Sequence, residues 1–391
     1  MKTMHKVLLS GMATLIFTNT TVSTEISGSE NNSSSRNTNH LKLIDAKTIP
    51  FDKTYKDTKV GGLSGITYDP SNNQWLLISD DRSEHNAARF YEADIDYNNN
   101  KFKNINFKDM HTLKQPNGND YPNKEEYNDD KNNTVADPES IRFDPKNNEI
   151  LYTSEGDRSL GLNPFIRKAN KQGEYLSEIP ITDTIKMNED PKVGFRNNQA
   201  IEGSTFSQNG NSIWTSMEGP LFQDDEKPTT KSGALTRITQ YDHEGSVISE
   251  FAYPLDPIPK SPGKGKQADN GVTEILAIND HEFFTLERAS VQAEDGSFSN
   301  YVRIYKIDVN NSTDIQHIES LKQEKVKPLK KELVADLNEE NIDKIDNIEG
   351  MTFGKKLPNG NDSLVLISDN NFNKSQKSQV IAFEVIPEKD K

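Results

Sequence analysis

The sequence predicts an all-β fold, a single β-propeller of five blades, with six blades as the alternative. Three observations predict it. A similar β-hairpin occurs five times along the 391 residues. A further run of alternating apolar and polar residues follows each hairpin, and four of these five units continue into a fourth strand. A spare strand at 41–51 can complete the last unit, and four-stranded units repeated radially are typical of a propeller.

The hairpin that organises the chain lies between Arg196 and Pro220. Two β-prone runs flank Asn209-Gly210-Asn211, which is typical turn chemistry. Glu202 opens the first run and Glu218 closes the second. Because Gly210 lies midway between the two glutamates, we expect their carboxylates to face each other across the antiparallel pair.

The other four hairpins carry polar or acidic residues at the same two places. The corresponding pairs are Ser64 and Asp80, Glu139 and Glu155, Glu202 and Glu218, Glu274 and Glu287, and Glu349 and Asp369. The first three pairs are each 16 positions apart, the fourth hairpin is shorter and the fifth is longer. This regularity predicts that the pairs occupy equivalent places in successive blades.

The remaining strands follow in chain order. Third strands are expected at 89–95, 165–171, 234–241, 301–309 and 378–385. Outer strands are expected at 103–113, 174–181, 247–253 and 328–337. The fifth unit has no fourth strand of its own, so the strand at 41–51 is expected to close the ring. A six-bladed fold requires degenerate strands hidden in 117–136.

The N-terminal region is expected to lie outside the propeller. Residues 1–23 are typical of a secretory signal peptide, because Lys2 and Lys6 precede an apolar run at 7–17. A membrane anchor is the alternative, but eleven apolar residues are too few to cross a bilayer. Residues 24–40 are rich in Ser and Asn and are expected to form a disordered leader. The propeller domain is then expected at 41–391.

The composition of the chain limits the classes of partner that it can bind. The formal net charge is −15 and the chain has no cysteine. Such an acidic chain is a poor partner for nucleic acid or an anionic membrane surface. Without cysteine it forms no disulfide and carries no lipid-modified cysteine. We therefore expect a secreted monomer without membrane insertion.

The hairpin acids are expected to gather on one rim near the propeller axis. They are Asp80, Glu139, Glu155, Glu202, Glu218, Glu274, Glu287, Glu349 and Asp369. Carboxylates a few ångströms apart repel one another, and bound divalent cations, with Ca²⁺ first, relieve that repulsion. A structural alternative is open for each acid, since it could bond backbone N–H groups of the next blade or pair with a nearby arginine. Those arginines are Arg82, Arg158, Arg196 and Arg288.

Other chemistries find little support in the sequence. The segment Gly62–Gly65 is not the G-x-S-x-G turn of a serine hydrolase. The seven histidines show no metal-binding spacing. His85 follows the first hairpin, and we expect it to be a solvated loop residue rather than part of the rim. Trp75 and Trp214 are expected in the core.

The hairpin motifs resemble those of the phytase-like family known for "esterase-like activity of phytase". The resemblance covers about 41–386 and rests on G-L-S-G-I, D-P-E-S-I, R-N-N-Q-A-I-E-G, G-V-T-E-I-L with L-E-R, and N-I-E-G-M with S-D-N-N-F. Ser140 and Asn198-Gln199 depart from the family pattern, but neither change removes an acid. The resemblance implies hydrolysis of a small phosphoester or ester, with Ca²⁺ shielding phosphate charge and activating water.

On the hydrolytic interpretation, Glu139, Glu155, Glu202 and Glu218 form the catalytic group. One of them acts as a general base while the others hold metal. Arg82, Arg158, Arg196 and Arg288 are the expected substrate-binding residues, because a guanidinium matches phosphoryl oxygens. The alternative function is a non-catalytic secreted propeller, stabilised by Ca²⁺, that binds a cell-wall or extracellular ligand.

Overall fold

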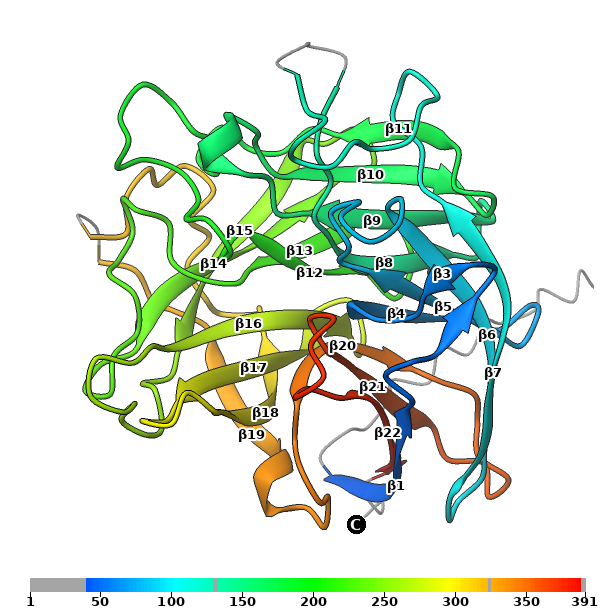
Figure 1. Cartoon of the computed structure of the whole chain (residues 1–391). Coiled ribbons are helices and arrows are strands. Elements are labelled where there is room, and N and C mark those ends of the chain that lie inside the picture. Colours follow the sequence, from blue (N-terminus) through cyan, green and yellow to red (C-terminus); the bar gives the residue numbers. More distant parts are fainter. Residues whose placement is uncertain (1–39, 129–132, 323–324, 388–391) are drawn as a thin grey trace, which may run out of the picture. The chain divides into compact units, whose positions relative to one another are not determined.

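Five antiparallel sheets of four strands each make up the structure (Figure 1). It is a computed structural model that describes residues 40–128, 133–322 and 325–387. The expected signal peptide at 1–23 lies outside the described residues, as does the expected leader up to residue 39. His40, the last residue of that leader, already belongs to the first strand.

Four of the sheets are formed by strands that follow one another directly along the chain. Blade 1 contains β4 (Leu63–Asp69), β5 (Gln74–Ser79), β6 (Arg89–Tyr97) and β7 (Phe102–Thr112). Blade 2 contains β8 (Pro138–Asp144), β9 (Glu149–Ser154), β10 (Phe165–Asn170) and β11 (Tyr175–Ile179). Blade 3 contains β12 (Ile201–Phe206), β13 (Ile213–Met217), β14 (Ala234–Tyr241) and β15 (Val247–Leu255). Blade 4 contains β16 (Ala268–Ala277), β17 (Glu282–Gln292), β18 (Phe298–Asp308) and β19 (Lys330–Asp336).

Blade 5 combines the two ends of the described chain. It contains β20 (Asn347–Phe353), β21 (Ser363–Asp369) and β22 (Ser378–Ile386), and β1 (His40–Ile49) is its outer strand. β1 runs antiparallel to β22, with Leu41 opposite Val385 and Ile49 opposite Ser378. The expected closure by the N-terminal strand is therefore confirmed.

The first strands of the blades form a closed ring. β4 contacts β8, β8 contacts β12, β12 contacts β16, β16 contacts β20, and β20 contacts β4 again. The segment between β7 and β8 holds one isolated bridge, Lys114 with Asp120, and no strand among its described residues. The propeller therefore has five blades, and the six-bladed alternative is wrong.

The core lies between neighbouring sheets because each blade packs its apolar side chains on the next. Trp75 of blade 1 belongs to a buried cluster with Val365 and Ile367 of blade 5. Trp214 of blade 3 packs on Phe283 of blade 4, with ring centres 4.5 Å apart. Both tryptophans are thus core residues, as the sequence predicts.

Short elements complete the fold. β2 (Thr54–Tyr55) and β3 (Thr58–Lys59) form a small hairpin before blade 1. The helices among the described residues are two single 3₁₀ turns, η1 (Arg158–Leu160) and η2 (Leu337–Glu339). No helix in the described ranges is long and apolar enough to cross a membrane.

A β-bulge recurs where the first strand of each blade begins. In blade 3, Met217 lies opposite Ile201 and Ser216 opposite Gly203, so Glu202 is the extra residue. Glu202 and Glu218 are therefore not directly opposite in register, but their carboxylates meet at the same end of the hairpin, as expected. Equivalent shifts fall at Ser64, at Glu139 with Ser140, at Thr273 and at Glu349. A bulge redirects one side chain. The residues at this position therefore depart from the regular alternation of side chains between the two faces of the strand.

Candidate functional site: an acidic pocket at the propeller axis

A pocket of about 720 Å³ opens where the first strands begin and the second strands end, and all five blades contribute to its wall. Its carboxylates are Asp80, Asp81, Glu84, Asp137, Glu139, Glu155, Glu202, Glu218, Asp269, Glu349 and Asp369. Its guanidinium groups are Arg82 and Arg288. We call this site the acidic pocket. It contains seven of the nine hairpin acids singled out in the sequence.

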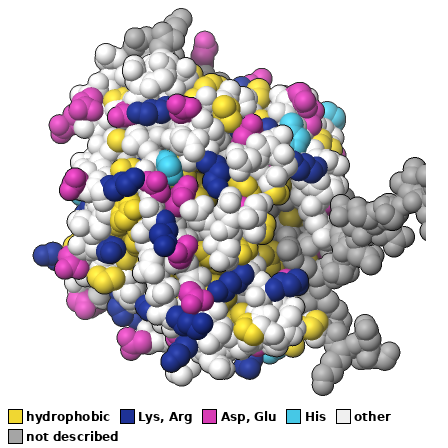
Figure 2. Space-filling view, turned by 90° about the vertical axis from the view of Figure 1, so that its right-hand side faces the viewer, with side chains coloured by type: hydrophobic (Ala, Val, Ile, Leu, Met, Phe, Trp, Pro, Cys, Tyr) yellow, Lys and Arg dark blue, Asp and Glu magenta, His cyan; other side chains and the backbone are white. Residues whose placement is uncertain are grey.

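The outer surface has a different character from the acidic pocket. Figure 2 shows one side of the molecule, on which basic and acidic side chains lie interspersed. Blade 1 supplies examples, with Lys108 paired to Asp94 at 2.8 Å and Lys103 paired to Asp96 at 3.5 Å. The strong local excess of acid in the pocket is not seen on this side of the molecule.

Two positions that recur in the blades supply seven of the eleven pocket carboxylates and Arg288. The first is the bulge, occupied in chain order by Ser64, Glu139, Glu202, Thr273 and Glu349. The second position is on, or directly after, the second strand of each blade. The residue before the bulge pairs with a residue of this strand, and the second position comes directly after that partner. It is occupied by Asp80, Glu155, Glu218, Arg288 and Asp369. Blade 4 therefore carries a threonine and an arginine where three other blades carry two acids.

Glu274 lies outside the acidic pocket, because it is one residue beyond the bulge. Its carboxylate forms a 2.6 Å ion pair with Arg142 of blade 2 and accepts a 3.1 Å hydrogen bond from the backbone N–H of Ser204 in blade 3. Both partners of the ion pair are at least 96% buried. Burial raises the pKa of Glu274 to about 7, and Arg142 opposes that rise.

Arg142 also links this ion pair to other blades around the propeller axis. Its guanidinium donates to the carbonyl oxygens of Ile66 in blade 1 at 2.9 Å, Ser204 in blade 3 at 2.5 Å and Ile275 in blade 4 at 3.2 Å. The backbone of Met351 in blade 5 also hydrogen-bonds to Glu274. One buried pair thus contacts all five blades, and a structural role accounts for its charges.

Glu287 also lies outside the acidic pocket. Adjacent residues of a strand point to opposite faces, so Arg288 faces the pocket and Glu287 does not. The Glu287 carboxylate accepts hydrogen bonds from Tyr253 Oη at 2.7 Å and Asn270 Nδ2 at 3.0 Å, and it pairs with Lys331. These contacts join blades 3 and 4.

Six of the seven hairpin acids in the pocket are buried, and Asp80 is half-buried. Burial, together with the charges of their neighbours, raises the pKa values of Asp80, Glu139, Glu155 and Glu202 well above the ordinary range. Burial raises the pKa of Asp369 to about 6. It raises the pKa values of Glu218 and Glu349 to about 8, although Arg288 opposes both rises.

Asp137 belongs to the same group, and the sequence-based selection missed it. It is 4% exposed, it pairs with Arg82, and burial raises its pKa to about 6. A usable signal was present in D-P-E-S, because Asp137 is an acid only two residues before Glu139, at the start of the predicted strand.

Two groups of three carboxylates have the geometry of cation ligands. Asp137, Glu139 and Glu155 can each place an oxygen within 4.8 Å of the others, and so can Glu155, Glu202 and Glu218. Glu155 belongs to both groups. All the donors are carboxylate oxygens, which suit hard cations such as Ca²⁺ and Mg²⁺. The side chains of Glu139 and Glu202 accept no hydrogen bond from the described residues, so their oxygens are free to act as ligands.

The four arginines singled out in the sequence divide into two pairs. Arg82 lies in the pocket beside Asp137 and donates to Asn198 Oδ1 at 3.1 Å. Arg288 lies in the pocket and donates to Glu218 at 2.9 Å and Asn347 Oδ1 at 2.5 Å. These two guanidinium groups are the cations that a ligand in the pocket would meet.

Arg158 and Arg196 lie outside the pocket lining. Arg158 donates to the carbonyl oxygens of Val193 at 3.0 Å and Phe195 at 2.8 Å. Arg196 donates to the carbonyl oxygens of Pro220 at 3.1 Å and Asp225 at 2.9 Å. Both arginines therefore hold loops of blades 2 and 3 in place.

Comparison with known proteins identifies a family. A family model described as "Phytase-like: Esterase-like activity of phytase" matches residues 58–372. This span includes four complete blades and the hairpin of the fifth. No curated protein sequence matches the chain.

Solved structures give distant likenesses. A thermostable family-43 glycoside hydrolase has a TM-score of 0.43 at 11% identity, with 86% of this chain and 94% of that chain covered. The catalytic domain of an α-L-arabinofuranosidase from Coprinopsis cinerea has a TM-score of 0.40 at 8% identity, with 89% and 98% covered. A mannose phosphorylase from Leishmania mexicana has a TM-score of 0.37 at 8% identity, with 88% covered in each chain. Likenesses this weak carry no argument about function.

Proposed function

Because this chain belongs to the phytase-like family, we propose that it is a metal-dependent hydrolase that cleaves phosphoesters in the acidic pocket. Membership of this family supports a hydrolase-like function for the propeller. The observation that carries the finer proposal is the pair of carboxylate groups that share Glu155. Four of their five members are the residues that the sequence predicts as catalytic, and Asp137 is the fifth.

The proposed ligands of the cations are four of these five acids. Asp137, Glu139 and Glu155 would hold one ion, and Glu155 and Glu218 a second, which leaves Glu202, the third member of that group, to act as the base. Bound Ca²⁺ would supply charge shielding for the phosphoryl group and lower the pKa of bound water. Ca²⁺ is the first candidate because it accepts six to eight oxygen ligands in flexible geometry. Asp80, Glu349 and Asp369 extend the oxygen-rich wall on the blade 1 and blade 5 side.

The protein's own side chains would bind the substrate and move the proton. Arg82 and Arg288 would contact phosphoryl oxygens, since a guanidinium presents parallel donors to phosphate. Glu202 would accept the proton of the attacking water, because its carboxylate has no hydrogen-bond donor among the described residues. Burial raises the pKa of this carboxylate, which increases its affinity for the proton of the attacking water. Arg158 and Arg196 are not proposed as substrate-binding residues, because their N–H groups already donate hydrogen bonds to loop carbonyl oxygens.

A binding function without turnover is the second candidate. Two guanidinium groups are few for a phosphate site, and both already have carboxylate partners. This scarcity favours a propeller that holds Ca²⁺ and recognises a cell-wall or extracellular ligand. The two functions predict opposite results with p-nitrophenyl phosphate, bis(p-nitrophenyl) phosphate, phytate and short acyl esters. Hydrolysis that requires Ca²⁺ supports the enzyme, and inert substrates across the panel support the binding protein.

Secretion is also a proposal, and it rests on the expected signal peptide at 1–23. N-terminal sequencing of protein recovered from the culture medium tests it. A chain that begins near residue 24 supports secretion, and a chain retained in the cell with residues 1–23 intact contradicts it.

A further inference from the structure

Aromatic side chains share the acidic pocket with its carboxylates. Phe372 follows β21, His85 follows β5 and Phe298 begins β18, and all three line the pocket. The rings of His85 and Phe372 are 4.3 Å apart at an angle of 40°. We call Phe372, His85 and Phe298 the aromatic rim. It gives a mostly polar pocket an apolar surface for a ligand.

Phe372 lies directly beside the acids. A Cβ atom built on Gly62 would come within 2.6 Å of the Phe372 ring and within 2.1 Å of Asp80 Oδ1. The ring and the carboxylate therefore approach the same glycine from the pocket side. Phe372 has a φ of 51° and Asn371 a φ of 46°, which is uncommon for residues other than glycine. The chain thus adopts a costly turn that places the ring there.

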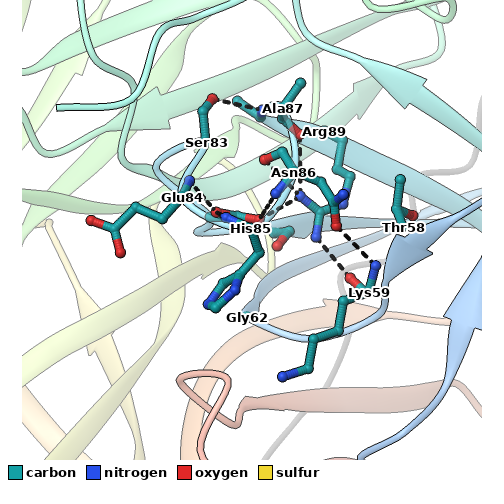
Figure 3. A network of polar contacts seen from close by, with 12 residues as sticks. Thr58, Lys59, Gly62, Ser83, Glu84, His85, Asn86, Ala87 and Arg89 are labelled. Atoms are coloured by element: carbon teal, nitrogen blue, oxygen red, sulfur yellow. Dashed lines mark hydrogen bonds and ion pairs between the residues drawn. The ribbon is translucent and has the colours of Figure 1, made fainter. Parts of the chain in front are cut away.

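The loop that carries His85 is held in shape by Asp81. The Asp81 carboxylate accepts the backbone N–H groups of Glu84 at 2.8 Å, His85 at 3.0 Å and Asn86 at 2.9 Å. It also forms a 2.8 Å ion pair with Arg89. Figure 3 shows this network and the His85 ring extending away from it, toward the same side as the Lys59 side chain. His85 is therefore prepositioned before a ligand binds.

Phe298 is the more exposed of the two phenylalanines that line the pocket. Its side chain is 46% exposed, although it lines a concave site. Aromatic side chains in such positions commonly bind planar or apolar groups of a ligand. Phe298 comes from blade 4, whereas His85 and Phe372 come from blades 1 and 5. A ligand that touches both parts of the rim would span the mouth of the pocket.

The charge of the pocket sets a second condition on the ligand. Eleven carboxylates and two guanidinium groups line it among the described residues. Even with two divalent cations bound, the fully ionised wall would keep a net negative charge. Coulomb repulsion therefore opposes ligands with many negative charges. It opposes a phosphodiester much less, because a phosphodiester carries a single negative charge.

We infer that the substrates of this site are phosphodiesters with at least one planar, apolar alcohol group, and that polyphosphorylated alcohols are excluded. This inference rests on the proposed function, since it assigns the substrate class of the same hydrolytic site. The diester phosphate lies against Arg82 and Arg288, and the planar group lies on Phe372. In the reaction, water oxygen bonds to phosphorus, the bond from phosphorus to the aryl oxygen breaks, and the alcohol leaves with one proton. The other product is the phosphomonoester.

The test compares three substrates and two aromatic variants in the presence of Ca²⁺. We expect kcat/KM for bis(p-nitrophenyl) phosphate to exceed that for p-nitrophenyl phosphate, and phytate to be the poorest substrate. Binding is measured separately by calorimetry with diphenyl phosphate as the probe. The variant Phe372→Leu should raise its Kd about tenfold, which corresponds to the loss of one aromatic contact. Phe206→Leu is the matched control, because Phe206 also lies beside a histidine, His243, but outside the pocket.

Each outcome separates this inference from the proposed function. Hydrolysis that favours phytate, or an unchanged Kd in Phe372→Leu, overturns the substrate class while the hydrolase stands. Binding of diphenyl phosphate that depends on Phe372, without turnover of any substrate, supports the ligand class and contradicts hydrolysis. Absence of both binding and turnover overturns both. A rise in Kd of the same size in Phe206→Leu would overturn the assignment of the contact to Phe372.

Discussion

Arg288 donates a 2.9 Å hydrogen bond to Glu218 from the position that the other four blades fill with an acid. The same guanidinium lies 3.5 Å from Glu349. The Arg288 guanidinium thus lowers the electrostatic repulsion among the carboxylates of the neighbouring blades 3 and 5. The two candidate cation sites lie on blades 2 and 3, where Glu139, Glu155 and Glu202 form no ion pair with a described residue.

The axial ion pair should be essential to stability. Replacing Arg142 by Leu leaves the Glu274 carboxylate buried without its partner, and breaking a buried pair typically costs about 3–5 kcal/mol. We expect a loss of this size in the free energy of unfolding, measured by urea denaturation. The double variant Arg142→Met with Glu274→Leu should recover part of it, because no uncompensated charge stays buried. A single variant as stable as the parent would contradict the axial role.

Closure of the propeller by β1 predicts the effect of truncation. Removing residues through Ile49 exposes the edge of β22, and unpaired strand edges promote aggregation. We therefore expect a lower melting temperature and aggregation in light scattering. Removal of residues 24–39, which precede β1, is the matched control and should leave both unchanged. Equal melting temperatures for the two truncations would show that β1 contributes little.

The pocket acids predict an unusual pH dependence of the metal-free protein. The folded-state pKa values of Glu218 and Glu349 are about 8, whereas the ordinary value is 4.5. A raised pKa means that the folded state binds the proton more tightly than the unfolded state. These groups therefore favour folding most below about pH 4.5, and that contribution is lost as pH rises toward 8. In chelator, the melting temperature should fall over this range.

Added Ca²⁺ should reverse that trend. Cation binding requires ionised carboxylates, so its affinity rises with pH. The increase in melting temperature on adding Ca²⁺ should therefore be larger at pH 8 than at pH 5, and differential scanning calorimetry measures both. At a hundredfold excess over Kd, binding to the folded state alone contributes about 2.7 kcal/mol. An increase that is the same at both pH values would contradict binding by these acids.

Glu202→Gln separates a catalytic role from a structural one. The substitution keeps shape and hydrogen-bonding capacity but removes the charge. As the proposed general base, Glu202 should be needed for turnover, and we expect kcat to fall about 10²–10⁴-fold. The melting temperature at saturating Ca²⁺ should change little. Full activity in the variant would exclude the catalytic role, and activity that follows the folded fraction would indicate a structural strut.

The sequence predicts the fold well because the repeat involves whole strands. Five hairpins, the third strands and the strand at 41–51 all lie where the alternation and turn residues place them. The site is predicted less completely because a β-bulge changes the register by one residue. The hairpin pattern pairs Glu274 with Glu202, whereas the bulge makes Thr273 the equivalent of Glu202. The same shift in register makes Arg288, and not Glu287, the residue of β17 that lines the pocket.

Other features of the site depend on contacts between blades, which sequence spacing does not show. Arg142 resembles an ordinary strand residue in D-P-E-S-I-R, yet it meets carbonyl groups of three other blades. Arg158 and Arg196 lie beside acids in the sequence, but the carbonyl groups that bind them come from loops. Phe372 and Phe298 are far apart in the chain, so their meeting at one pocket requires the closed ring.

Glu155 offers the most direct test of hydrolysis at the acidic pocket, because it belongs to both candidate cation groups. The measurement is the initial rate of bis(p-nitrophenyl) phosphate hydrolysis against free Ca²⁺, for the parent protein and for Glu155→Gln. We expect the parent rate to rise with Ca²⁺ and saturate, and the variant rate to stay at least about 10²-fold lower at every Ca²⁺ concentration. Equal rates in the two proteins, or a parent rate that chelator does not change, would contradict metal-dependent hydrolysis at this site.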